Sequence, residues 1–136
     1  MENELVVASG YFDPVHVGHL EYLKKSKELG NILIVIVNNN NQKTLKAGSY
    51  MIDEQDRLEI VRNIKCVDMA ILSIDQDRSV CKTLELLHSL FNVDIFTNGG
   101  DVTNDTCREK ETCEKLGIKM IDNLGQKIRS SSQYKR

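Results

Sequence analysis

The most constraining feature of this chain of 136 residues is the uninterrupted apolar run ILIVIV, from Ile32 to Val37. Six residues are too few to cross a membrane, and a run rich in β-branched side chains favours a strand buried on both faces. Strands covered on both faces belong almost entirely to parallel sheets with a helix layer on either side. The run therefore predicts an α/β fold built on a parallel sheet.

Strand-like and helix-like segments alternate along the rest of the chain. Strands are expected at residues 5–8, 32–37, 69–73, 93–97 and 118–121. Helices are expected at residues 17–29, 54–64 and 80–90, and from a cap at Asp105 or Thr106 to Leu116. This order predicts one domain over residues 1–136, a Rossmann-like three-layer sandwich with a five-stranded, mainly parallel sheet.

A parallel sheet of this kind binds its ligand beyond the carboxyl ends of the strands. The loops that follow the strands are therefore the informative ones, and they are residues 9–16, 38–53, 73–79, 98–103 and 123–131. The asparagine run from Asn38 to Asn41 is expected to be a solvated loop.

Composition argues against several classes of partner. A formal net charge of -2 gives no strong electrostatic footprint for nucleic acid. No apolar run reaches the roughly 20 residues of a membrane helix, and the acidic start does not resemble a signal peptide. The four cysteines form no CxxC pair and are expected to be structural thiols, which points to a reduced cytoplasmic compartment.

The strongest motif, GYFDPVHVGH, extends from Gly10 to His19 across the first strand-to-helix junction. His16 and His19 are three residues apart, which puts both imidazoles on one side of a helix start, where N–H groups and the helix dipole favour anions. Gly18 leaves room for a phosphate to approach the backbone. The motif predicts a polyphosphate site, in which imidazoles donate hydrogen bonds as charge accumulates on the α-phosphate and the bridging oxygen.

Two other readings of this histidine pair remain open. Both imidazoles could bind a metal, although zinc usually needs three or four ligands and the chain has only one further histidine, His88. They could also be surface residues on an amphipathic helix.

The decapeptide resembles the GxFDxxHxGH signature of the cytidylyltransferase-like nucleotidyltransferases. The segment DIFTNGGD, from Asp94 to Asp101, is similar to the strand-plus-GGD segment of that family. The segment KIRSSS, from Lys127 to Ser132, is similar to its late Ile-x-Ser-Ser signature. KAGSY from Lys46 and EQDR ending at Arg57 stand where the family has its phosphate-binding lysine and an arginine-bearing helix start. The resemblance covers nearly the whole chain.

The resemblance implies a role for each matching residue. Catalysis falls to His16, His19 and Lys46, with the lysine neutralising the α-phosphate and the acceptor phosphate. The nucleotide-binding residues that it implies are Gly10, Tyr11, Phe12, Asp13, Gly18, Gly99, Gly100, Asp101, Ile128, Ser130 and Ser131. The acceptor-binding residues that it implies are Lys43, Arg57 and Arg129. Asp13 is in addition a candidate to orient a histidine or to approach Mg²⁺.

Each residue also has a plainer reading. Lys46 alone reads as a solvated loop residue, Asp101 as part of a simple turn, and Ser130 as a helix N-cap. Arg57 could pair with carboxylates on its own helix instead of an acceptor. Two departures from the family pattern, Val102 where many relatives carry a basic residue and the lack of an arginine shortly before Ile128, leave the acceptor and the base open.

The reaction implied is an in-line attack by an acceptor phosphate oxygen on the α-phosphorus of an NTP, with Mg²⁺ bridging the phosphates and pyrophosphate leaving. CTP or ATP is the expected donor, and glycerol phosphate, phosphoethanolamine or a sugar phosphate the expected acceptor. Homodimerisation is a family expectation. The alternative is a non-catalytic module of the same fold that binds and senses a nucleotide.

Overall fold

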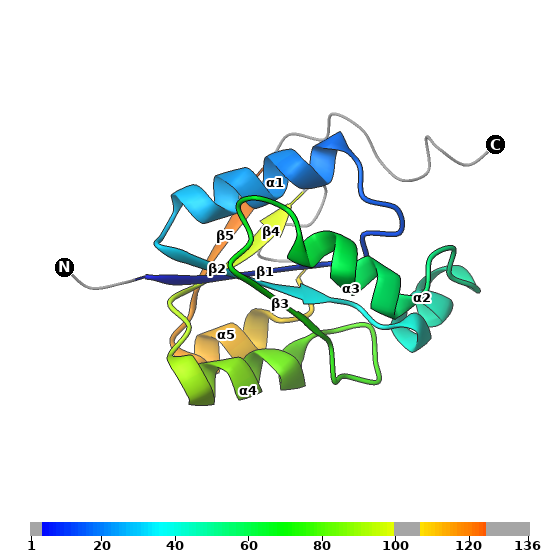
Figure 1. Cartoon of the computed structure of the whole chain (residues 1–136). Helices are drawn as coiled ribbons and strands as arrows, with labels where there is room; N and C mark the ends of the chain where they lie inside the picture. The colour runs from blue at the N-terminus through cyan, green and yellow to red at the C-terminus, as the bar shows by residue number, and fades with distance from the viewer. Residues whose placement is uncertain (1–3, 100–106, 125–136) are drawn as a thin grey trace.

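The computed structural model describes residues 4–99 and 107–124, which form a sheet between two layers of helices (Figure 1). The strands are β1 (Leu5–Gly10), β2 (Ile32–Val37), β3 (Met69–Leu72), β4 (Ile95–Gly99) and β5 (Lys119–Leu124). The helices are α1 (Val17–Glu28), α2 (Asn40–Ala47), α3 (Glu54–Arg62), α4 (Cys81–Phe91) and α5 (Lys110–Leu116).

The sheet has the strand order β3-β2-β1-β4-β5, and every neighbouring pair in it is parallel. β1 is the central strand, with Val7 beside Ile34 of β2 and beside Phe96 of β4. From β1 the chain adds β2 and β3 on one side of the sheet, and then adds β4 and β5 on the other side of β1. The switch point of this sheet therefore lies at the carboxyl ends of β1 and β4, where α/β sheets bind ligands.

Alternate residues of each central strand enter opposite cores. In β1, Leu5 and Val7 face the core under α4 and α5, whereas Val6 and Ala8 face the core under α1 and α3. Figure 1 shows these helix pairs on opposite faces of the sheet. The run Ile32 to Val37 is apolar throughout because both of its faces are covered. The predicted three-layer α/β fold is confirmed.

The prediction of a solvated loop at the asparagine run is wrong. Asn39 caps α2 by accepting a hydrogen bond from the backbone N–H of Gln42 at 2.9 Å. The side chain of Gln42 accepts in return from the backbone N–H of Asn39 at 3.0 Å, which completes a capping box. Gly48, at φ 85°, ends the helix in the left-handed conformation that glycine tolerates best. Asn38 itself is buried.

The last described helix also starts later than expected. α5 begins at Lys110, and Glu109 precedes it in a turn rather than in helix. The carboxylate of Glu109 accepts hydrogen bonds from the backbone N–H of Val80 at 2.8 Å and from the thiol of Cys107 at 3.0 Å. These bonds tie the segment before α5 to the start of α4.

The four cysteines are free thiols. Burial is the main cause that raises the pKa of Cys107 and of Cys113 to about 12, so both remain protonated core residues at neutral pH. Within residues 4–99 and 107–124, no helix is both long and apolar enough to span a bilayer.

Candidate active site

The loop after β1 turns sharply beneath the end of that strand. A Cβ atom on Gly10 would lie 2.8 Å from the ring of Phe12, so glycine is the residue that this close approach admits. Phe12 has a φ of 54°, a left-handed conformation that is costly for an aromatic residue, and its ring is buried. The turn therefore depends on the packing of Phe12, which fixes the direction of the loop toward α1.

His16 and His19 lie at the beginning of α1 and stack on each other, with ring centroids 3.9 Å apart and ring planes 25° apart. His16 is the N-cap residue, and its Nδ1 accepts a hydrogen bond from the backbone N–H of Gly18 at 3.1 Å. The Nδ1 of His19 accepts from the backbone N–H of His16 at 3.2 Å. Phe12 packs edge-on against the ring of His19 at 4.9 Å. Two imidazoles thus form the capping box of this helix.

The same contacts determine the protonation state and the tautomer of both histidines. Burial, the neighbouring His16 and the charge of Lys46 together lower the pKa of His19 from 6.5 to about 3. Burial also lowers the pKa of His16. A neutral imidazole whose Nδ1 is an acceptor carries its proton on Nε2. Each histidine is therefore a neutral Nε2–H donor at neutral pH.

Two lysines from α2 approach the same loop. The Nζ of Lys46 lies 4.4 Å from the ring centroid of Tyr11, and the Nζ of Lys43 lies 5.8 Å from it. Both distances are within the range of cation–π attraction. Because the charge of Lys46 also affects the pKa of His19, the structure brings together the three residues to which catalysis was assigned.

Lys43 is buried and forms an ion pair with Asp13, with 3.6 Å between its Nζ and Oδ2. The two carboxylate oxygens of Asp13 also accept hydrogen bonds from the backbone N–H groups of Met51 and Ile52, at 2.8 and 2.7 Å. Asp13 thus ties the loop after β1 to the segment before α3. The structure does not bring Asp13 to a histidine in the way the sequence led us to expect.

The environment of Asp13 bears directly on the metal expected there. Both of its oxygens already accept backbone hydrogen bonds, and its side chain is fully buried. Among residues 4–99 and 107–124, no three histidine, cysteine, aspartate or glutamate side chains are grouped so that they could hold a metal ion. The metal role expected of Asp13 stays a prediction, and any Mg²⁺ there would have to compete with these backbone N–H groups for the carboxylate.

Arg57 also differs from its expected role in acceptor binding. Its side chain is fully buried and makes four hydrogen bonds. Its acceptors are the backbone carbonyls of Ile52, Tyr11 and Asn38 and the side chain of Asn40, at 2.6 to 2.9 Å. Because all of these hydrogen bonds are to the protein, the guanidinium links three segments at the carboxyl edge of the sheet and does not face a ligand.

Of the remaining predicted site residues, two glycines lie in described elements and the others lie outside the described ranges. Gly99 ends β4 beside Tyr22, and a Cβ atom there would lie 2.7 Å from the tyrosine ring. Gly18 is in the first turn of α1. The residues that lie outside the described ranges are Gly100, Asp101, Ile128, Arg129, Ser130 and Ser131.

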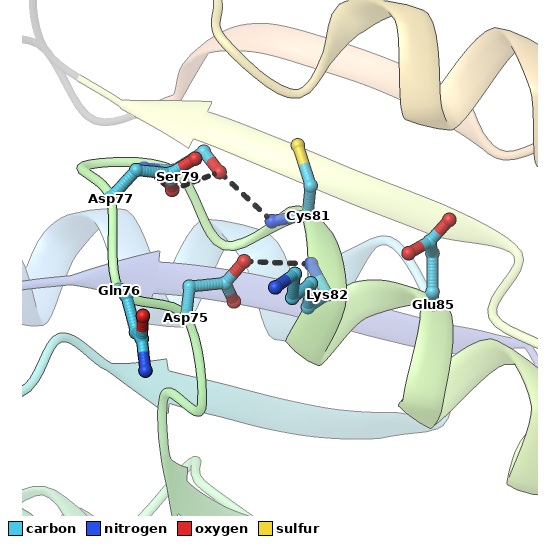
Figure 2. A pocket seen from close by; sticks show the side chains of 7 residues that line it. All are labelled: Asp75, Gln76, Asp77, Ser79, Cys81, Lys82 and Glu85. Carbon is cyan, nitrogen blue, oxygen red and sulfur yellow. Dashed lines mark hydrogen bonds between the residues drawn. The ribbon is translucent and has the colours of Figure 1, made fainter.

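A polar pocket of about 490 Å³ follows β3 at the start of α4 (Figure 2). Asp75 caps this helix, because its carboxylate accepts hydrogen bonds from the backbone N–H groups of Lys82 and Thr83 at 2.8 and 3.0 Å. Asp77 and Glu85 add two further carboxylates to its wall. A pocket with this charge disfavours phosphate, so it does not compete with the histidine site for the nucleotide.

Comparison with known proteins identifies the family of this chain. A family model described as cytidylyltransferase-like matches residues 7–133. The chain is 32% identical to the FAD synthase of Thermoplasma volcanium, over 96% of this chain and 91% of the relative. It is 35% identical to the Bifunctional protein HldE of Syntrophotalea carbinolica over 87% of this chain, but it spans only 24% of that relative's length.

A solved structure is also similar to this chain in both fold and sequence. The lipopolysaccharide core biosynthesis protein from Thermoplasma volcanium superposes with a TM-score of 0.75 at 31% identity, covering 91% of this chain and 98% of that one. The family match spans both the histidine motif after β1 and the strand that ends at Gly99. The chain therefore belongs to the cytidylyltransferase-like family of nucleotidyltransferases.

Proposed function

We propose that this protein transfers AMP from ATP to the phosphate of an acceptor of the FMN type and releases pyrophosphate. Sequence reasoning left CTP and ATP open as donors. Several relatives at 30% identity or more carry the name FAD synthase, and FAD consists of FMN joined to AMP. That name supports ATP as the donor and a phosphomonoester as the acceptor.

The observation that carries the proposal is the histidine pair. His16 and His19 use their Nδ1 atoms to cap α1, which leaves Nε2–H as the donor of each ring. Two neutral donors held in a stack, with Lys46 nearby, are suited to an α-phosphate and to the oxygen that bridges to the leaving group. They stabilise charge as it develops without having to lose a proton first.

The proposed step needs no covalent enzyme intermediate. An oxygen of the acceptor phosphate forms a bond to the α-phosphorus as the bond from that phosphorus to the bridging oxygen breaks, and pyrophosphate leaves with the electron pair. An ionised phosphate needs no general base. The contributions of this chain are position, hydrogen bonds from His16 and His19, and positive charge from Lys46.

Mg²⁺ enters the proposal as part of the substrate, bound to the triphosphate. The homodimer and the cytoplasmic location expected from the sequence remain predictions. Sedimentation velocity of the purified chain would test the dimer.

A second acceptor class is a sugar phosphate. It is favoured by the likeness to the lipopolysaccharide core biosynthesis protein, since the core of a lipopolysaccharide is a saccharide. The same site would serve both acceptors, because the attacking group is a phosphate oxygen in each case. The two candidates differ in what must be bound beyond the phosphate.

The test is pyrophosphate release with ATP, CTP, UTP and GTP, each paired with FMN and with a panel of sugar phosphates and phosphorylated alcohols. Mass spectrometry of the product identifies the nucleotide and the acceptor that have been joined. His16→Ala is the inactive control. Release that requires ATP and FMN, and that disappears in the variant, supports the proposal.

Other outcomes point elsewhere. Release with ATP and one sugar phosphate, but not with FMN, replaces the first acceptor by the second. Release with CTP alone contradicts AMP transfer. Nucleotide binding by calorimetry without release from any pair contradicts the proposed reaction and favours a nucleotide sensor.

A further inference from the structure

The hydroxyl of Tyr22 joins the histidine helix to two strands of the sheet. Tyr22 is buried on α1, three residues after His19. Its hydroxyl donates a hydrogen bond to the backbone carbonyl of Thr97 in β4 at 2.9 Å. The same oxygen accepts from the backbone N–H of Ser9 in β1 at 3.4 Å. One side chain therefore contacts the ends of both β1 and β4.

The pairing between β1 and β4 stops at the level of this hydroxyl. The last pair is Ala8 beside Thr97. Each strand continues for two residues, 9–10 and 98–99, and within the described part of the chain no pairing joins these two segments. Residues 9–10 remain paired with β2, and Gly99 remains paired with β5. The carboxyl ends of β1 and β4 are therefore unpaired with each other at the switch point of the sheet.

The ring of Tyr22 supports the end of β4. A Cβ atom on Gly99 would lie 2.7 Å from Cδ1 of this ring and 3.0 Å from its Cγ, so the ring fills the space that a larger residue would need. The register between β4 and β5 shifts between Thr97 and Gly99, and an irregularity of this kind bends a strand. Tyr22 thus holds the bent segment from both ends of its side chain.

The environment makes the Tyr22 hydroxyl a fixed structural donor. Burial is the main cause that raises its pKa to about 12, so the group stays protonated at neutral pH. A buried hydroxyl is costly unless it is hydrogen-bonded, and the partners of this one belong to the two strand ends. The proposed reaction gives Tyr22 no role of its own.

The charges of the site suggest which half of ATP lies near these strand ends. Lys46, from the helix that follows β2, has its Nζ 4.4 Å from the ring centroid of Tyr11 in the histidine loop. Its charge attracts the triphosphate to the β2 side of that loop. The β4 side is then left for the uncharged nucleoside, at the switch point where α/β sheets bind ligands.

We propose that Tyr22 is a positioning residue that sets the spacing between the carboxyl ends of β1 and β4, so that the nucleoside half of ATP binds between Gly10 and Gly99. Its hydroxyl fixes the last paired level, and its ring fixes the height of Gly99. This inference rests on the proposed function, and it concerns the nucleoside rather than the phosphates.

The test is calorimetry of the full chain with ATP and, separately, with inorganic tripolyphosphate, which lacks the nucleoside. Tyr22→Phe removes the hydroxyl and keeps the ring. Ser26→Ala is the matched control, because Ser26 is a buried hydroxyl on the same helix, one turn farther from the histidines. Its Oγ contacts Oγ1 of Thr97 at 3.0 Å and donates to the carbonyl of Tyr22 at 2.9 Å.

Tyr22→Phe is expected to weaken ATP binding about tenfold and to leave the affinity for tripolyphosphate within about twofold of the parent value. In the transfer reaction, the KM for ATP should rise by a similar factor while the KM for the acceptor stays within about twofold. Ser26→Ala should lower Tm, as the loss of a buried hydrogen bond does, but it should bind both ligands like the parent.

Three results would overturn the inference. The first is an unchanged affinity of Tyr22→Phe for ATP. The second is an equal loss of affinity for ATP and for tripolyphosphate, which would show that the hydroxyl acts on the phosphate half. The third is a loss of ATP affinity in Ser26→Ala as large as that in Tyr22→Phe, which would indicate a general effect of destabilising α1.

Gly99→Ala provides an independent variant, and thermal denaturation verifies that each protein is folded. Its methyl group would press on the ring of Tyr22, so it should displace the end of β4 and cause the same selective loss of ATP affinity. If Tyr22→Phe does not fold, this variant decides the inference, and ATP affinity equal to that of the parent rejects it.

The inference and the proposed function can fail separately. Binding of ATP by the parent without pyrophosphate release from any pair counts against the function, while the comparison of ATP with tripolyphosphate still decides the role of Tyr22. Release that proceeds with a selective loss in neither Tyr22→Phe nor Gly99→Ala leaves the function intact and rejects the inference. A parent chain that does not bind ATP rejects both.

Discussion

The Nδ1 of His19 accepts the backbone N–H of His16 at 3.2 Å, so the second histidine of the motif caps the helix that carries the first. The Nδ1 of His16 accepts in the same way from Gly18 at 3.1 Å. One nitrogen of each ring accepts a backbone N–H, and the other nitrogen carries the proton of the ring. The helix start thereby sets the tautomer of both histidines.

Replacing His19 by Asn should separate these two uses of the ring. The side-chain oxygen of Asn can accept from His16 in place of Nδ1, but it cannot supply a donor at the position of Nε2. We expect kcat to fall by about 10²–10³, as for the loss of one transition-state donor, with little change in Tm. His19→Ala should lose activity and also about 1 kcal/mol of stability, because the cap is lost. Similar stability of the two variants would show that the cap has little energetic weight.

The pH dependence of stability should report the buried state of His19. In the unfolded chain this residue titrates near 6.5, whereas in the folded protein its pKa is about 3. Between these values the unfolded state binds more protons, so the free energy of unfolding should fall as the pH decreases below 6.5. This titration of His19 lowers the free energy of unfolding by at most about 1.4 kcal/mol for each pH unit below 6.5, and it has no effect above pH 7.5.

Denaturant titrations of the parent and of His19→Asn at pH 7.5, 6.5 and 5.5 measure that contribution. The difference in stability between the two proteins should change in favour of the variant as the pH falls. A difference that is the same at all three pH values would show that His19 titrates normally in the folded protein.

Arg57 should matter for stability rather than for acceptor affinity. Its guanidinium donates to Ile52, Tyr11 and Asn38, and Arg57→Lys would leave most of these buried carbonyls without a partner. Each unsatisfied group costs about 1–3 kcal/mol, so we expect a loss of several kcal/mol in chemical denaturation. A variant that is as stable as the parent and has a raised acceptor KM would restore the role in acceptor binding.

Asp13→Asn tests whether this side chain holds a metal. The amide can still accept from the N–H of Met51 or Ile52, but it loses the charge that pairs with Lys43. We expect lower stability and an unchanged Mg²⁺ concentration for half-maximal activity. An increase in that concentration of tenfold or more, at fixed ATP, would identify Asp13 as a metal ligand after all.

Much of the fold could be predicted from the sequence because its signals are local. The run Ile32 to Val37 and the repeated spacing of apolar residues were enough to predict a parallel sheet in three layers. Helix α2 also has a local signal, an Asn39–Gln42 capping box followed by Gly48, but the asparagine-rich composition concealed it. The start of α5 had no such signal, because Glu109 is held by Val80 of a distant segment.

The histidine pair and Lys46 could be predicted to lie at one site from the sequence because their spacing and their neighbours follow a recognisable motif. The roles of Asp13 and Arg57 could not be found in this way. Both are charged residues beside a predicted phosphate site, and only the folded chain shows that their partners are backbone groups up to 46 residues away. Charge next to a site predicts proximity to the ligand, but it does not predict which polar groups the fold leaves unsatisfied.

By itself the sequence determined the class of fold, the family and the position of the imidazole pair, since these depend on hydrophobic period and on residues close together in the chain. Tertiary structure decided which charges are available for chemistry. Asp13 and Arg57 are buried and bonded to backbone groups, whereas Lys46 remains exposed beside the ring of Tyr11. The physical reason is that a buried polar group must be satisfied, and its partners come from loops that meet only when the sheet has formed.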